Sequence, residues 1–149
     1  MISDNPFATV FLADDDDDTR TSLSETLRGD GYDVVEARDG AELLELLADS
    51  VGTPWQRPDI IITSALMPCY SGLGVLGALH QSRWDIPVIL LTGGRHAATI
   101  TRVTRDALRL GAAAVFRKPF DVTDLRTAIL AAHSGCLSWG ARGASAPRT

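Results

Sequence analysis

The sequence predicts an α/β protein built on an open, doubly wound parallel sheet of five strands. Short apolar runs alternate with amphipathic helical segments five times along the 149 residues. The runs are apolar at nearly every position rather than at alternate ones, which is typical of strands buried on both faces of a parallel sheet. Right-handed crossovers between such strands place helices on both faces.

The first strand is expected at residues 9–13, and it stops at the five consecutive aspartates of residues 14–18. Aspartates favour a helix start because their carboxylates accept hydrogen bonds from free N–H groups and interact well with the positive helix end. Glycines at positions 29 and 31 are expected to end that helix. The remaining strands are expected at residues 32–37, 59–63, 86–91 and 112–116, and the remaining helices around 43–47 and 73–79 and over about 97–110 and 121–133.

Length and composition fit one globular domain, expected at residues 1–133, with a Gly-, Ala- and Ser-rich tail at 134–149 that we expect to be flexible. Hydrophobic residues make up 45% of the chain, yet no apolar run approaches the roughly 20 residues of a membrane span. The first residues lack the positive region of a signal peptide, so a cytoplasmic location is expected. Two cysteines are too few for a disulfide framework.

Charge is unevenly distributed along the chain, whose net charge is −5. Residues 1–50 have a net charge of −11, residues 51–94 are neutral, and residues 95–149 have a net charge of +6. This asymmetry fits either an ordinary solvated surface or a basic docking face on the C-terminal half. The acidic total argues against direct nucleic-acid binding.

Polar side chains stand where the predicted strands end: Asp14, Asp15, Ser64, Thr92 and Lys118. Because ligands of doubly wound sheets sit at the carboxyl ends of the strands, these side chains are expected to share one pocket. Adjacent carboxylates favour a divalent cation, whereas hydroxyl and ammonium groups suit a phosphoryl oxygen or an anionic side chain. The structural alternative is a solvated helix cap with a salt bridge from Lys118 to Asp14 or Asp15.

Five segments in order carry a family resemblance: Val10 to Asp16, Pro58 to Ser64, Leu66-Met67-Pro68 with Gly72, Pro87 to Gly93, and Gly111 to Phe120. With these segments the chain resembles the receiver domains of bacterial two-component response regulators over about residues 8–133. The resemblance implies a flavodoxin-like fold with strand order 2-1-3-4-5.

The resemblance also assigns roles to individual residues. Asp14, Asp15 and Leu66 match positions of the family's Mg²⁺ site. Thr92 matches the hydroxyl that contacts the phosphoryl group, and Lys118 matches the lysine that pairs with a phosphoryl oxygen. Pro119 matches a proline that usually follows a cis peptide bond.

Two positions depart from the family pattern. Ser64 stands where the family carries its phosphate-accepting aspartate, and Val115 replaces the switch aromatic residue. A serine hydroxyl is a weak nucleophile without a general base. The substitution also removes one charged metal ligand, so bound Mg²⁺ is expected to be weak or absent.

The sequence therefore predicts a stand-alone receiver that is not an enzyme and acts by contacting a signalling protein, either a histidine kinase or a downstream effector. No contact with membrane or nucleic acid is expected, and a homodimer through the fourth helix, fifth strand and fifth helix is one possibility. The first alternative is a working receiver that uses Ser64 or a neighbouring aspartate as acceptor. The second is a flavin- or nucleotide-binding protein, which the aspartates disfavour because they repel phosphate.

Overall fold

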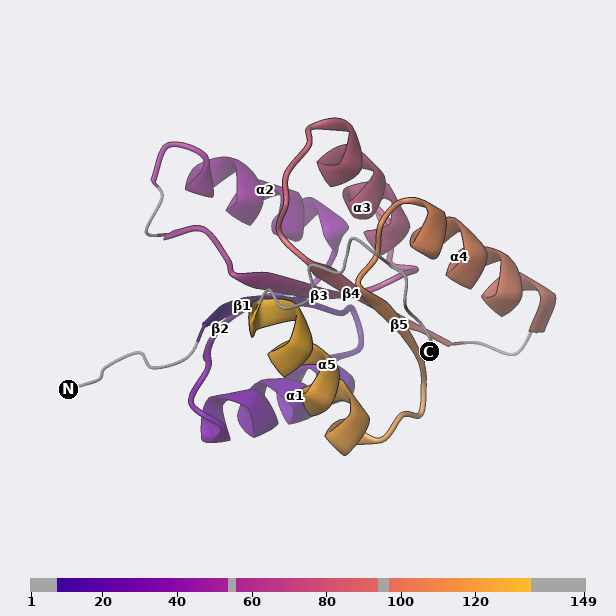
Figure 1. Cartoon of the computed structure of the whole chain (residues 1–149), viewed down its shortest axis with the longest axis horizontal. Helices are drawn as coiled ribbons and strands as arrows, with labels where there is room; N and C mark the ends of the chain where they lie inside the picture. The colour runs from indigo at the N-terminus through magenta and orange to yellow at the C-terminus, as the bar shows by residue number, and fades with distance from the viewer. Residues whose placement is uncertain (1–7, 54–55, 94–96, 135–149) are drawn as a thin grey trace.

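The computed structural model describes residues 8–53, 56–93 and 97–134. Its strands are β1 (Thr9–Ala13), β2 (Asp33–Ala37), β3 (Ile60–Ser64), β4 (Val88–Thr92) and β5 (Ala114–Arg117). Its helices are α1 (Asp17–Gly29), α2 (Gly40–Ser50), α3 (Gly72–Gln81), α4 (Ala97–Arg109) and α5 (Val122–Ser134). The strands form a parallel sheet in the order β2-β1-β3-β4-β5, which confirms the predicted topology (Figure 1).

Helices cover both faces of this sheet. α1 and α5 lie on one face, and α2, α3 and α4 lie on the other (Figure 1). One hydrophobic cluster joins the sheet to α2 and α4 through residues such as Leu43 and Val103, and a second joins it to α1 and α5 through Leu23 and Ile129. The central strands β3 and β4 are buried at every position, which explains why their sequences show no polar alternation.

The aspartate run behaves partly as loop and partly as helix. Asp16 is the N-cap of α1, and its side chain accepts a hydrogen bond of 3.2 Å from the N–H of Asp18. Asp14 and Asp15 therefore remain in the loop that follows β1. At the other end, α1 stops after Gly29, and Gly31 adopts a φ of 102° that favours glycine.

Four of the five strands differ from the sequence prediction by one or two residues at an end, and the differences in β3, β4 and β5 have clear physical causes. β3 extends to Ser64, because Ser64 pairs in parallel register with Leu91 of β4. β4 starts after Pro87 rather than before it, since proline has no N–H to donate to the sheet. β5 starts two residues late because the Ala112 N–H bonds to the Ala107 carbonyl at 2.9 Å, which closes the end of α4 instead of pairing a strand.

At the C-terminal end, α5 extends through Ser134, one residue beyond the predicted boundary. The rest of the predicted tail, residues 135–149, lies outside the described residues. Within the described ranges, none of the helices has the length and apolar character needed to cross a membrane.

Candidate functional site

A pocket of about 250 Å³ opens at the carboxyl ends of the strands. It forms where the loops after β1, β3 and β4 meet the end of β5, as the doubly wound topology requires. Four of the five side chains that the sequence placed there do share it. The residues that line it are Asp14, Asp15, Asp16, Ser64, Leu66, Leu91, Gly93 and Lys118.

An ion pair between Lys118 and Asp14 lies at the centre of the pocket. The Lys118 Nζ is 2.8 Å from Oδ2 of Asp14, whose side chain is completely buried. The other carboxylate oxygen, Oδ1, accepts a hydrogen bond of 3.0 Å from the N–H of Asp16. Asp15 is exposed, so Asp14 is the partner of Lys118. Both oxygens of the buried carboxylate are thus satisfied, as a charge removed from water requires.

Arg20, a residue that the sequence analysis did not single out, holds the backbone of the acidic loop. This arginine is buried, and its Nη1 donates a hydrogen bond of 2.7 Å to the Asp14 carbonyl. Its other nitrogens contact Asp17 at 2.6 Å and Glu36 of β2 at 3.2 Å. The available signal was its position three residues after Asp17, where one turn of helix brings the two side chains together.

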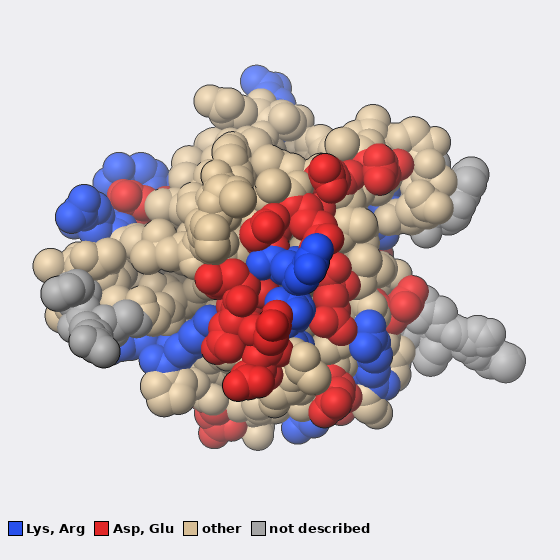
Figure 2. All heavy atoms as spheres, turned by 180° about the vertical axis from the view of Figure 1, so that it is seen from behind, with Lys and Arg blue, Asp and Glu red and all other residues tan. Residues whose placement is uncertain are grey.

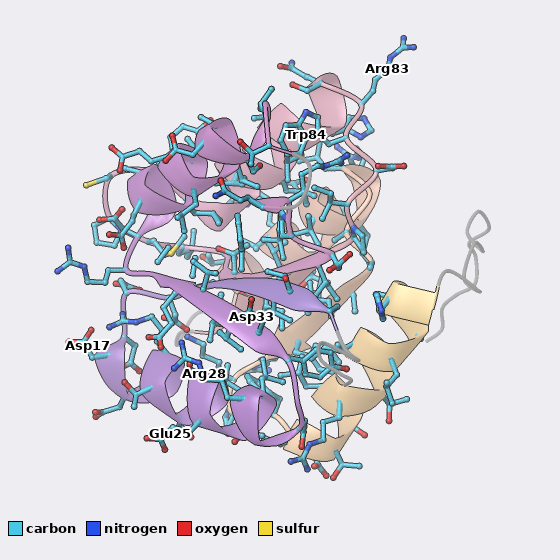
Figure 3. All side chains as sticks on the ribbon, turned by 90° about the vertical axis from the view of Figure 1, so that its left-hand side faces the viewer. Asp17, Glu25, Arg28, Asp33, Arg83 and Trp84 are labelled. Atoms are coloured by element: carbon cyan, nitrogen blue, oxygen red, sulfur yellow. The ribbon has the colours of Figure 1, made fainter. Side chains whose placement is uncertain are left out.

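Glu36 is the shared acceptor of a polar cluster between α1 and β2. Ser24 donates to it at 2.8 Å, and Arg28 lies 3.3 Å from it; Figure 3 shows Arg28 between helix and strand. Burial alone would raise the pKa of Glu36, but hydrogen bonds from Ser24 and Arg20 outweigh burial, so that pKa is lowered. Burial likewise opposes the charge on Arg20, but hydrogen bonds to Asp17 and Glu36 raise its pKa.

Ser64 ends β3 and is nearly buried. Its Oγ donates a long hydrogen bond of 3.4 Å to the Leu66 carbonyl. No described carboxylate, imidazole or amine lies within hydrogen-bonding distance of that hydroxyl, so the described part of the chain supplies no general base for it. The Ser64 carbonyl faces Gly72, where a Cβ would lie only 2.0 Å from its oxygen, so glycine is required there.

Thr92 does not line the pocket, contrary to the prediction from the sequence. Residues alternate between faces along a strand, so Thr92 lies on the same side as Leu90, which packs in the cluster under α2, α3 and α4. The Thr92 hydroxyl is buried and has no hydrogen-bond partner among the described residues. The half-buried Val115 packs against that same cluster. The peptide bond between Lys118 and Pro119 is cis, as predicted.

The donor atoms of the pocket suit a hard cation in type but not in arrangement. Asp14, Asp15 and Asp16 supply carboxylate oxygens, the ligands that Mg²⁺ prefers. However, no three carboxylate, histidine or cysteine side chains of the described residues converge closely enough to hold a metal ion. Among the described carboxylates that line the pocket, Asp14 is the buried one, and it already binds Lys118. A cation at Asp14 must therefore compete with an ammonium.

Comparison with known proteins identifies the family. The model of the response regulator receiver domain matches residues 10–130, and the chain therefore belongs to that family of two-component signalling domains. It is 34% identical over 116 residues to the transcriptional regulatory protein CpxR of Escherichia coli K12 and to the response regulator MprA of Mycobacterium sp. strain KMS. These matches cover 78% of the chain but 45% and 46% of the relatives, so the chain spans about half their length.

Solved structures support the same assignment. A response regulator receiver domain protein from Clostridium thermocellum superposes with a TM-score of 0.73 at 27% identity, covering 86% of this chain and 95% of that one. A structure titled FixJ-N superposes with a TM-score of 0.72, also at 27% identity, covering 86% and 94%. The predicted flavodoxin-like receiver fold is thereby confirmed.

Proposed function

We propose that this receiver domain acts by binding a partner protein and not by accepting phosphate on an aspartate. The observation that carries the proposal is that Ser64 ends β3 and lines the pocket. By the sequence resemblance, this is the position at which receiver domains carry their acceptor aspartate. Its hydroxyl bonds to a backbone carbonyl and has no base beside it among the described residues. Lys118, which would contact a phosphoryl oxygen, is already paired with Asp14.

We further propose that Mg²⁺ binds this pocket weakly or not at all. Asp14, Asp15 and the Leu66 carbonyl are the groups that would hold it, and its role there would be to neutralise phosphoryl oxygens. Ser64 contributes no charge to the site, and Lys118 competes for Asp14 at 2.8 Å. In titrations of both proteins with Mg²⁺, Ser64→Asp should therefore bind the ion more tightly than the wild-type chain.

The direct test is intact-mass measurement after incubation with Mg²⁺ and acetyl phosphate. Wild type and Ser64→Ala should stay unmodified, whereas Ser64→Asp should gain one phosphoryl group, because only an aspartate carboxylate attacks phosphorus without a base. Labelling of wild type but not of Ser64→Ala would make Ser64 the acceptor. Labelling of both would move the acceptor to another residue such as Asp14 or Asp15. Either result would overturn the proposal.

The proposed partner is a signalling protein, either a histidine kinase or a downstream effector, met in the cytoplasm. We propose no enzymatic activity and no direct contact with nucleic acid or membrane. The pocket supports this view because Asp14, Asp15 and Asp16 line it, and such an acidic surface repels anionic ligands and anionic surfaces.

We also propose that two copies associate through α4, β5 and α5. Leu108 of α4 and Leu130 of α5 are both more than half exposed, and β5 is a sheet edge whose residues Ala114 to Phe116 are only half-buried. A partly covered edge strand flanked by exposed leucines is a surface that a second copy can bury.

A further inference from the structure

Exposed apolar side chains gather in the loop between β3 and α3, residues 66–70, which we name the anchor loop. Leu66 is 51% exposed and Tyr70 is 38% exposed, and Pro68 and Cys69 between them are also exposed. Single exposed apolar residues are common on protein surfaces, but a contiguous group of them is typical of a binding site. Leu66 also lines the pocket, so the anchor loop begins at the pocket mouth.

The anchor loop is held in one conformation by close backbone contacts. A Cβ added to Gly40 would lie only 1.8 Å from the Tyr70 carbonyl oxygen, so the loop backbone packs directly on the start of α2. The Tyr70 N–H bonds to the Pro68 carbonyl at 2.8 Å, and Ser71 caps α3 through the N–H of Gly74 at 2.9 Å. A loop fixed in this way loses little conformational entropy when it binds a partner.

Acidic side chains border the anchor loop on two sides. Asp15 and Asp16 share the pocket with Leu66, and neither forms an ion pair with a described residue. On the other side, Asp39 caps α2 immediately before Gly40, whereas the carboxylate of Glu42 in the first turn is already paired with Arg38 at 3.8 Å. Figure 2 shows acidic side chains concentrated on one face of the molecule around a few basic ones. The anchor loop is thus an apolar patch with an acidic rim.

We propose that the anchor loop docks a helix of a partner protein whose apolar stripe is flanked by lysine or arginine. Leu66 and Tyr70 would bury their side chains against the apolar stripe, and the rim formed by Asp15, Asp16 and Asp39 would attract the flanking cations. This inference rests on the proposed function, in which the domain acts by binding protein, and it specifies the chemistry of the partner.

The test uses two synthetic helical peptides with the same leucine stripe, one with lysine and one with glutamate on its polar face. Fluorescence anisotropy should show that the chain binds the lysine peptide and not the glutamate peptide. Leu66→Ser and Tyr70→Ser should each weaken this binding about fivefold or more, as loss of a buried anchor does. Chemical-shift mapping should place the bound peptide on residues 66–70.

Matched variants distinguish binding at the anchor loop from non-specific binding to exposed apolar side chains. Val51 is 64% exposed at the opposite end of α2, so Val51→Ser removes an exposed apolar side chain away from the loop and should leave binding unchanged. Asp15→Asn together with Asp16→Asn should weaken binding and reduce its salt dependence, because asparagine still caps α1 but carries no charge. Thermal melts of every variant establish that it is folded.

Three outcomes would overturn the inference. The first is equal binding of both peptides, and the second is equal weakening by Val51→Ser. The third is a change in the self-association of the chain alone in Leu66→Ser, which would make a second copy the occupant. Phosphoryl labelling is measured separately. If the wild-type chain accepts a phosphoryl group and still prefers the lysine peptide, only the proposed function is contradicted. If the wild-type chain accepts no phosphoryl group and binds neither peptide, only the docking site is contradicted.

Discussion

At the scale of single residues, the pocket is organised around the buried carboxylate of Asp14. The carboxylate accepts hydrogen bonds from the Lys118 ammonium and from the Asp16 N–H, and the backbone carbonyl of Asp14 accepts one from Arg20. In the receiver family the lysine pairs with a phosphoryl oxygen, whereas here it pairs with Asp14 at 2.8 Å. The chain contains a single lysine among 14 basic residues. That residue therefore neutralises a buried charge in this structure.

Replacing Lys118 by methionine should destabilise the fold, because the variant leaves the Asp14 carboxylate buried without its cation. We expect a loss of about 2 kcal/mol in the free energy of unfolding, measured by urea denaturation at neutral pH. The double variant Asp14→Asn with Lys118→Met should recover part of that loss, since it removes the unpaired charge as well. A double variant no more stable than Lys118→Met alone would show that the ion pair does not set the stability of the pocket.

At the scale of elements, α1 is joined to β2 by the polar cluster of Arg20, Ser24, Arg28 and Glu36 as well as by apolar packing. The cluster lies directly behind the loop that carries Asp14, and Arg20 links the two. Because Arg20 is buried and contacts three separate groups, its position is fixed. The position of α1 therefore fixes the position of the pocket loop through the side chain of Arg20.

The lowered pKa of Glu36 predicts a specific pH dependence of stability. A carboxyl group whose pKa is lower in the folded chain contributes stability above its unfolded value, 4.5, and that contribution disappears as pH falls through the folded value. The stability of Glu36→Gln should therefore fall below that of wild type at neutral pH and converge with it well below pH 4.5. Urea denaturation across this range measures the difference.

Glu25 provides the control for this prediction. It lies exposed on α1, as Figure 3 shows, and forms no ion pair or hydrogen bond with Arg20 or Arg28. Glu25→Gln should follow the wild-type pH profile throughout. A constant difference between Glu36→Gln and wild type at every pH would mean that packing, and not ionisation, explains the effect.

At the scale of the whole molecule, the charge asymmetry of the sequence corresponds to an acidic surface and a basic surface in different parts of the fold. The arginines near α1 and β2 are paired with acids, whereas Arg102 and Arg105 of α4 and Arg117 of β5 are exposed and form no ion pair with any described residue. The acidic rim of the anchor loop and the basic surface of α4 thus belong to different parts of the fold. The proposed partner helix and the proposed second copy would occupy different surfaces.

Sedimentation equilibrium tests the proposed homodimer. Wild type should shift from monomer to dimer as concentration rises, and Leu108→Glu should remain monomeric because it places a charge in the interface. Added salt should favour the dimer, since it screens the exposed arginines that the two copies would bring together. Val51→Glu, a change on the exposed end of α2, should associate like wild type. A wild type that is monomeric at all concentrations would contradict the proposal.

The sequence by itself determined the fold and most of the site. Five apolar runs in alternation with helical segments specify the parallel sheet, because a run that is apolar throughout must be buried on both faces. The order of short motifs then placed Asp14, Ser64, Leu66 and Lys118 at the strand ends, and all four line one pocket. These features depend on periodicity and on local chemistry, both of which can be read along the chain.

Only the tertiary structure decided which of these groups meet. Lys118 and Asp14 are 104 residues apart, and the choice of Asp14 over Asp15 depends on which of two adjacent side chains turns inward. Thr92 does not line the predicted pocket, because side chains alternate along β4 and place Thr92 on the same face of the sheet as Leu90. The contact between Gly40 and Tyr70 depends equally on how two loops pack. Distances between segments remote in sequence have no local signal, so the sequence could not specify them.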